Sequence, residues 1–178
     1  MRLFTGIALP PEASAPVLAL VDQLKPLAHI AWTKAEKLHI TTRFIGEWPE
    51  SRLEELKQAL STIQAPQPVD IRIHGLAWLP NPHRPLTVHA AVEATEPLKQ
   101  LAADTDAVLL QLGLIPEPRA YRPHVTLGRI RRQDRDPIGP LQHAVEQTRF
   151  SVAPFRAASF HLYLSADGTY TKLSDYPL

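Results

Sequence analysis

Apolar positions recur with a period of two residues in some stretches and of three to four residues in others. The first period predicts strands and the second predicts amphipathic helices. Strands are expected over 2–10, 37–47, 69–80, 85–94, 124–130, 151–165 and 170–178. Helices are expected over 11–24, 50–63 and 96–113, with a short fourth one opening at Asp136 and Pro137. Strands and helices mix without regular alternation, so the pattern predicts an α+β architecture.

Several local signals mark where these elements begin and end. Ser51 and Glu54 form a capping-box pattern for the second helix. Thr95 stands where it can cap the third helix, and Gly113 stands where that helix should close. The stretch "ADG" at 166–168 predicts a hairpin turn between the last two strands.

Length and composition narrow the class of protein. The chain has 178 residues, 44% of them hydrophobic and 21% charged, which predicts one globular domain over 1–178. No apolar run approaches the ~20 residues of a membrane span, and Pro10 and Pro11 come too early for a signal-peptide core. The absence of cysteine excludes disulfides and thiolate chemistry. We expect a cytoplasmic monomer that needs no protein partner and no membrane.

Positive charge is concentrated in one window, although the formal net charge is only +1. Between residues 119 and 136 two aspartates stand against six arginines, which are Arg119, Arg122, Arg129, Arg131, Arg132 and Arg135. A window of this kind indicates either a solvated surface loop or a site for an anionic ligand. It brackets a candidate catalytic histidine, which favours a phosphate-bearing ligand.

The sequence His-x-Thr occurs twice, about half a chain apart, as His39-Ile40-Thr41 and as His124-Val125-Thr126. In a strand, residues two apart share one face, so each motif places an imidazole beside a hydroxyl and turns its aliphatic residue toward the core. An imidazole can give or take a proton near neutral pH, and a hydroxyl can donate to an oxyanion. Two such pairs facing each other across a groove could hold a phosphate between two proton-transfer groups.

The stretches "RLFTGIALP", "LHITTRFIGE" and "YRPHVTLGR" resemble the two-histidine phosphoesterases, in the branch of LigT-like RNA 2′,3′-cyclic phosphodiesterases, also called 2′-5′ RNA ligases. The resemblance covers essentially the whole chain. It implies two pseudo-symmetric α+β lobes with antiparallel sheets around a central groove and helices on the outer faces. The family's catalytic histidines match His39 and His124, and its phosphate-binding threonines match Thr41 and Thr126.

Two positions depart from the family's pattern. Thr42 stands where an aliphatic residue is usual, and Arg122 replaces a residue that is often apolar or polar. Neither position belongs to the four central groups. Both can alter substrate preference.

The resemblance also implies a reaction. One histidine takes a proton from water as the water attacks a terminal 2′,3′-cyclic phosphate on RNA, and the other protonates the departing O3′, which leaves a 2′-phosphate. Attack and departure are roughly in line, so acid and base belong on opposite sides of the phosphorus. No metal or other cofactor is required, because imidazoles transfer the protons. The sequence does not say which histidine is the acid.

Three further residues are candidates for substrate binding. Arg43 has the strand parity of His39 and Thr41, so it can reach the phosphate or the next one along. Arg129 resembles a basic residue that often follows the second motif, but simple alternation places it on the opposite face unless a bulge near Gly128 turns it inward. Phe4 is a candidate to stack on a terminal base, with core packing as the alternative.

Other functions remain open from the sequence. A metallohydrolase would draw on the eight histidines, but no metal-ligand spacing groups them. A non-catalytic RNA-binding module would use the basic window alone. The same four groups would also serve 2′-5′ ligation or hydrolysis of a small cyclic phosphate.

Overall fold

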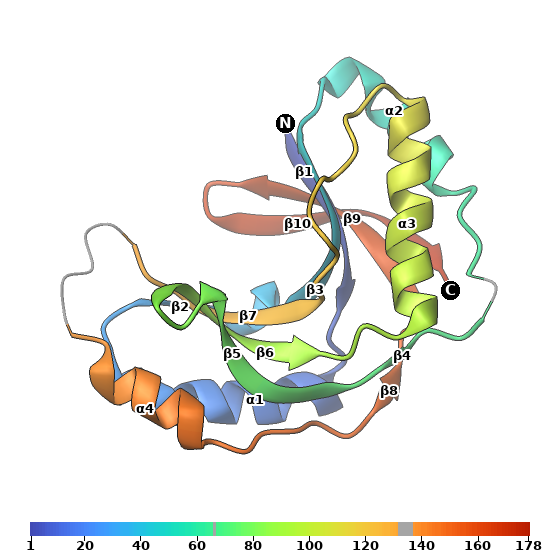
Figure 1. Cartoon of the computed structure of the whole chain (residues 1–178). Coiled ribbons are helices and arrows are strands. Elements are labelled where there is room, and N and C mark those ends of the chain that lie inside the picture. The colour runs from blue at the N-terminus through green and yellow to red at the C-terminus, as the bar shows by residue number, and fades with distance from the viewer. Residues whose placement is uncertain (66, 132–136) are drawn as a thin grey trace.

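Strands and helices follow one another as expected for an α+β chain (Figure 1). The computed structural model describes residues 1–65, 67–131 and 137–178. The α-helices are α1 (Pro11–Leu24), α2 (Leu53–Leu60), α3 (Glu96–Gln111) and α4 (Gly139–Gln147). The strands are β1 (Arg2–Ala8), β2 (Ala31–Trp32), β3 (His39–Glu47), β4 (Asp70–Ile71), β5 (Ile73–Asn81), β6 (Arg84–Val92), β7 (His124–Arg129), β8 (Phe155–Arg156), β9 (Ser159–Ala166) and β10 (Thr169–Pro177). Short 3₁₀ turns are η1 (Lys25–Leu27), η2 (Ala35–Lys37) and η3 (Glu50–Arg52).

Some predicted boundaries are confirmed and others are wrong. Gly113 closes α3 with a φ of 91°, and Asp167 and Gly168 form the β9–β10 turn with positive φ at both positions. The capping box is wrong, because Ser51 lies inside η3 and α2 begins after it without a side-chain cap. Thr95 does precede α3, but its hydroxyl makes no capping bond. The expected opening of the fourth helix at Asp136 lies outside the described residues.

Three strands differ from the prediction because their partners are distant in sequence. The stretch expected as one strand over 69–80 is divided into β4 and β5, which lie in different sheets. The stretch expected as one strand over 151–165 is divided, so that β8 pairs with β4 in a separate two-stranded sheet and β9 joins the main sheet. Strand β2 is too short to show a period, and it exists because it pairs with the end of β7. The hydrophobic periodicity of a segment does not show with which distant segment it pairs.

The main sheet has eight strands in the order β10-β9-β1-β3-β7-β6-β5, with β2 attached to β7, and all of these neighbours pair antiparallel. Its two lobes are β10-β9-β1-β3 and β7-β6-β5. They are joined by a single registered pair, Ile40 opposite Val125. The two lobes are those expected from the sequence, and their sheets are continuous through this one pair.

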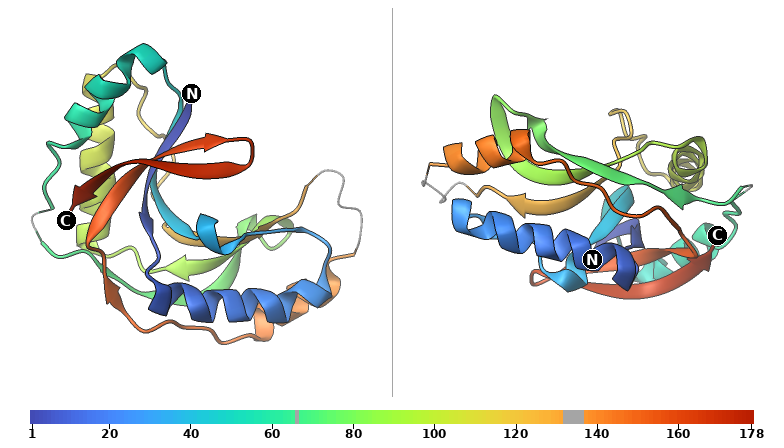
Figure 2. Two further views of the ribbon diagram at one scale, coloured as in Figure 1. Left: turned by 180° about the vertical axis from the view of Figure 1, so that it is seen from behind. Right: turned by 90° about the horizontal axis from the view of Figure 1, so that it is seen from below.

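The helices lie outside the sheet. Helices α2 and α3 pack against each other, α3 contacts β3, and α4 contacts β5. Figures 1 and 2 show α2 and α3 along one side of the molecule and α1 and α4 along another. Within the described residues, no helix combines the length and apolar character needed to cross a membrane.

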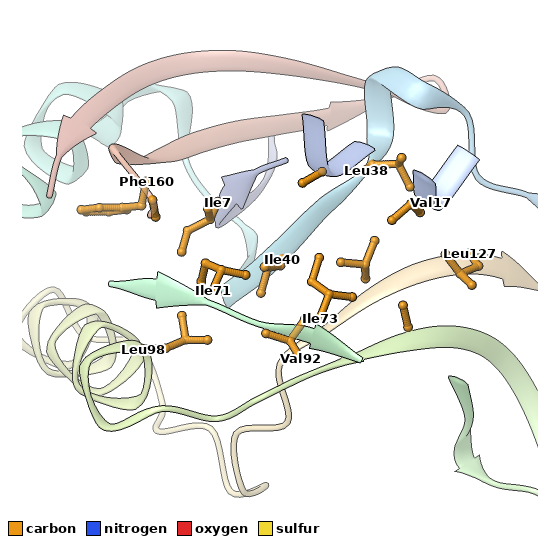
Figure 3. Packing of buried hydrophobic residues seen from close by; sticks show 14 of the residues in the cluster. Ile7, Val17, Leu38, Ile40, Ile71, Ile73, Val92, Leu98, Leu127 and Phe160 are labelled. Atoms are coloured by element: carbon orange, nitrogen blue, oxygen red, sulfur yellow. The ribbon is translucent and has the colours of Figure 1, made fainter. Parts of the chain in front are cut away.

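The core lies on the face of the sheet opposite the two histidines. Figure 3 shows Ile7, Ile40 and Leu127 packed with residues of the surrounding elements. Ile40 and Val125, the middle residues of the two motifs, are fully buried. Burying such side chains stabilises the fold by about 1.5–3 kcal/mol each. Core packing on one face therefore holds the junction that presents the histidines on the other.

Candidate active site

The two His-x-Thr motifs meet at the junction between the lobes. Ile40 and Val125 are opposite each other and both point to the core, so their neighbours in each strand point to the other face. In an antiparallel pair this register directs His39 toward Thr126 and Thr41 toward His124. The parity argument from the sequence therefore holds for all four groups, because it involves only residues next to the shared pair.

His39 is held in one tautomer. Its Nδ1 lies 2.7 Å from the carbonyl oxygen of Lys37, which can only accept, so Nδ1 carries the proton. Its Nε2 then has the lone pair and accepts a hydrogen bond from the Thr41 hydroxyl at 3.0 Å. Burial lowers the pKa of His39 to about 4, and the charges of His124 and Arg129 add to that lowering. In the free protein His39 is a neutral base at pH 7.

His124 repeats this arrangement in the other lobe. Its Nδ1 donates to the carbonyl of Arg122 at 2.8 Å, so the lone pair is again on Nε2. Burial lowers the pKa of His124, and the Arg129 charge lowers it further. Each motif therefore uses the carbonyl two residues before its histidine to set the tautomer. The result is a pair of neutral imidazoles, one from each lobe.

Phe4 is not exposed to stack on a base, which corrects its assignment as a substrate-binding residue. It is only 3% exposed, and its ring centroid lies 4.8 Å from that of His39. Tyr163 stacks on it at 5.0 Å, and Tyr170 meets it edge-on at 5.0 Å. Phe4 therefore supports the His39 ring from β1, buried among aromatic side chains on the groove face.

Arg43 does not reach the groove, which corrects the second expectation. Strand β1 pairs Gly6 with Thr41 but Thr5 with Arg43, so Thr42 is an extra residue and forms a bulge. The bulge reverses the parity beyond Thr41. The Arg43 guanidinium instead lies 2.6 Å from the Asp106 carboxylate on α3 and donates to the carbonyl of Ile115 at 2.8 Å. Its role is to tie β3 to α3 and to the segment that follows α3.

Arg129 is turned toward the groove by a matching bulge in β7. Strand β6 pairs His89 with Thr126 but Val88 with Gly128, so Leu127 is the extra residue. Arg129 then lies opposite Thr87, two residues from His89 and on the same face. Its charge lowers the pKa of both His39 and His124. This meets the condition that the sequence set for Arg129 to enter the site.

The two bulges also give Arg129 a counterpart in the first lobe. Each motif is followed by one extra residue, so the third residue after the threonine faces the groove. In β7 that residue is Arg129, and in β3 it is Phe44, which lies opposite Phe4. Phe44 is 50% exposed, unlike Phe4. Its ring is therefore exposed enough for a base to stack on.

His89 is a groove residue that the sequence analysis did not select. It lies opposite Thr126 on β6, is 7% exposed, and its ring meets that of His124 at 5.0 Å. Burial lowers the pKa of His89 to about 4, and the His124 charge adds to that lowering. The corresponding position opposite Thr41 is Gly6, where a Cβ would lie 2.8 Å from the Ile40 carbonyl oxygen. Only the pairing of β6 with β7 reveals His89, because its own sequence context carries no motif.

A pocket of about 220 Å³ lies beside His39 in the first lobe. Tyr163, Tyr170 and Glu36 are among its lining residues. The Lys37 amino group donates to the Gly168 carbonyl and lies over the Tyr170 ring, so it joins η2 to the β9–β10 hairpin. The pocket offers aromatic surface next to one of the two imidazoles. In the described part of the chain no three His, Asp or Glu side chains are grouped to hold a metal ion.

The role of Arg43 gives a stability prediction. Arg43→Met should lower the free energy of unfolding in urea by about 1–3 kcal/mol, because it leaves the Asp106 carboxylate without its partner at 25% exposure. Arg156→Met, which breaks the exposed Arg156–Asp70 pair, is the control and should cost less than ~1 kcal/mol. We expect kcat/KM of Arg43→Met to stay near that of the unmodified protein. If Arg43→Met lost activity while its free energy of unfolding stayed unchanged, Arg43 would have to act in the groove and not as a link between β3 and α3.

Comparisons with known proteins agree with this geometry. The family model described as LigT like Phosphoesterase matches twice, over residues 7–89 and 90–169, with one His-x-Thr motif in each match. An RNA 2′,3′-cyclic phosphodiesterase of Methanothermobacter thermautotrophicus is 30% identical over 144 residues, which cover 79% of this chain and 78% of that protein. One of Methanocaldococcus jannaschii is 29% identical over 166 residues, covering 93% and 91%.

Solved structures share the fold. A crystal structure of a Thermus thermophilus protein matches with a TM-score of 0.82 at 27% identity and covers 100% of this chain and 98% of that one. The structure of Escherichia coli LigT with 3′-AMP matches with a TM-score of 0.77 at 22% identity, covering 99% and 97%. The resemblance found in the motifs is confirmed over most of the chain. With two matches to the family model and two lobes that each carry a His-x-Thr strand, the chain belongs to the LigT-like phosphoesterase family.

Proposed function

We propose that this protein hydrolyses the terminal 2′,3′-cyclic phosphate of RNA and leaves a 2′-phosphate. The observation that carries the proposal is the pair of imidazoles from opposite lobes, each with its Nδ1 proton donated to a carbonyl, so that the lone pair is on Nε2. Relatives named RNA 2′,3′-cyclic phosphodiesterase support the choice of substrate.

The reaction uses each group once. One Nε2 takes a proton from water while the water oxygen attacks phosphorus, and the bond between phosphorus and O3′ breaks. The other histidine, protonated beforehand, gives its proton to O3′. Thr41 and Thr126 donate to the non-bridging oxygens as negative charge builds there, and Arg129 adds positive charge nearby. The terminal base packs against Phe44 or into the pocket lined by Tyr163 and Tyr170.

The deciding experiment is to incubate the protein with a short RNA that ends in a 2′,3′-cyclic phosphate, in the presence of EDTA, and to identify the product isomer. A 2′-phosphate is expected. A 3′-phosphate would reverse the assignment of the leaving oxygen, and turnover that needs added metal would favour a metallohydrolase. Salt-sensitive RNA binding without turnover would favour a non-catalytic RNA-binding module. Formation of a 2′-5′ linkage between RNA ends would show that the same groups catalyse ligation.

The lowered pKa values predict the pH dependence of kcat/KM, which reports the free enzyme. Catalysis needs one neutral and one protonated histidine, and this form is most populated between their two pKa values. Both pKa values lie below 6.5, with that of His39 at about 4. We therefore expect kcat/KM to peak below pH 6.5 and to fall as pH rises beyond it. A bound phosphodiester raises both pKa values, so the profile of kcat should lie at higher pH.

Burial is the main cause of both lowered pKa values, and Arg129→Gln tests the further contribution of the Arg129 charge. Removing the positive charge should raise the pKa of both histidines and move the kcat/KM profile to higher pH. Titration of the histidine ring protons by NMR reads the same shift without turnover. Arg156→Gln, on the distant strand β8, is the charge-matched control and should leave the profile in place. If the kcat/KM profile of Arg129→Gln did not move, the Arg129 charge would not influence the pKa values of the two histidines.

A further inference from the structure

A second pocket, which we call the basic pocket, lies at the far end of β7 and has a volume of about 600 Å³. Lys25, His29 and Arg131 supply its polar and charged lining, and Ile30 and Trp32 supply apolar lining. This combination suits a nucleotide, because phosphate binds cationic side chains while sugar and base rest on apolar surface. None of the residues assigned to the reaction lines this pocket.

Strand pairing places the basic pocket next to the catalytic groove. Ala31, which lines the pocket, lies directly opposite Arg129 in the β2–β7 ladder. Ile130 donates its backbone N–H to the Leu86 carbonyl and packs against the core, and Arg131 follows two residues after Arg129, just beyond the end of β7. Two residues of strand span about 7 Å, close to one step of an extended nucleic-acid backbone. Arg131 thus follows the groove residues His124, Thr126 and Arg129 in chain order and lines the basic pocket beside the end of β7.

We propose that the basic pocket binds the nucleotide that precedes the terminal one, so that the protein selects an RNA strand over a single cyclic nucleotide. This inference rests on the proposed function and names its substrate class. Arg129 and Arg131 would each meet a phosphate of the same strand. An acidic peptide shares only the negative charge, whereas the basic pocket lies beside the end of the strand that carries the phosphodiester site.

Lys25 stands at the mouth of the basic pocket and is available to a ligand. Its amino group lies 2.6 Å from the Asp22 carboxylate, and both side chains are at least half exposed. An exposed pair of this kind contributes little to stability, so the amino group can change partner when a phosphate arrives. The Asp22 carboxylate competes with that phosphate, so Asp22→Asn should strengthen binding of an oligonucleotide.

The test compares two substrates with the same reacting end, adenosine 2′,3′-cyclic phosphate and a five-nucleotide RNA that ends in it. We expect the RNA to have the higher kcat/KM and the steeper decrease with salt. Lys25→Gln/Arg131→Gln should reduce the salt slope for the RNA by about 0.7, since each phosphate contact on a single strand contributes ~0.7 and the basic pocket binds one upstream phosphate. The ratio of kcat/KM for RNA to that for the mononucleotide should fall with it. Arg72→Gln, which removes an exposed arginine paired with Glu93, is the control and should preserve the ratio.

The outcomes separate this inference from the proposed function. Equal kcat/KM for both substrates, or an equal loss on both in the double variant, would overturn the basic pocket as an upstream subsite while leaving the hydrolysis in place. Failure to hydrolyse either substrate would overturn the proposed function instead. Binding of a labelled RNA 2′-phosphate, measured by fluorescence anisotropy, adds a readout without turnover. A polyglutamate peptide that displaces this RNA from the unmodified protein as well as an unlabelled RNA does would overturn the choice of RNA.

Discussion

Replacing either histidine should abolish most turnover of an RNA 2′,3′-cyclic phosphate. We expect His39→Ala and His124→Ala each to lower kcat at least ~100-fold, because each removes one of the two proton transfers. The double variant should be little worse than either single one, because the two groups act in the same step. Single-turnover hydrolysis of an end-labelled RNA measures all three.

Two controls keep this prediction sharp. His83→Ala removes an exposed histidine at the β5–β6 turn and should leave kcat unchanged. His39→Ala also removes a ring that packs on Phe4, so His39→Gln is needed as a second variant. Glutamine fills much of the space but cannot exchange a proton at neutral pH. A folded His39→Gln with normal kcat would rule out proton transfer by His39.

Thr41→Val and Thr126→Val should each lower kcat by about 100-fold, with a much smaller effect on KM. Valine matches the shape of threonine but cannot donate to the phosphoryl oxygens, and the charge on those oxygens is greatest in the transition state. Mutations of this kind cost about 2.7–4 kcal/mol in other enzymes. Steady-state kinetics on the same cyclic-phosphate RNA separate kcat from KM.

Serine variants are the matched controls for the two threonines. Thr41→Ser and Thr126→Ser keep the hydroxyl, so they should retain most of the activity that valine loses. If serine and valine reduced kcat equally, the methyl group and its packing would explain the loss. The threonines would then support the strand rather than the phosphate.

The sequence predicted which side chains share a face of the strand wherever this depends only on neighbouring residues. The side chains of His39 and Thr41 share a face because they are two residues apart in one strand, and the same holds for His124 and Thr126. The buried middle residues, Ile40 in one motif and Val125 in the other, specify which face points to the core. These relations need no knowledge of the partner strand.

The residues beyond each motif could not be placed in this way. Simple alternation placed Arg43 in the groove and Arg129 outside it, and bulges at Thr42 and Leu127 reverse both placements. A bulge places two residues of one strand opposite one residue of its partner, so it cannot be predicted from the sequence of either strand alone. Contacts between distant segments also decide the burial of Phe4 against Tyr163 and the position of His89 beside His124.

By itself, the sequence predicted the α+β class, the family, and the four His and Thr side chains that share one face of their strands. Only the tertiary structure decided which cation lies on that face, which aromatic residue supports His39, and that a second pocket lies beside the end of β7. The physical reason is the range of the interactions. Side-chain parity is set within a few residues of one strand, whereas register, bulges and pockets depend on pairs of segments that meet only when the chain has folded.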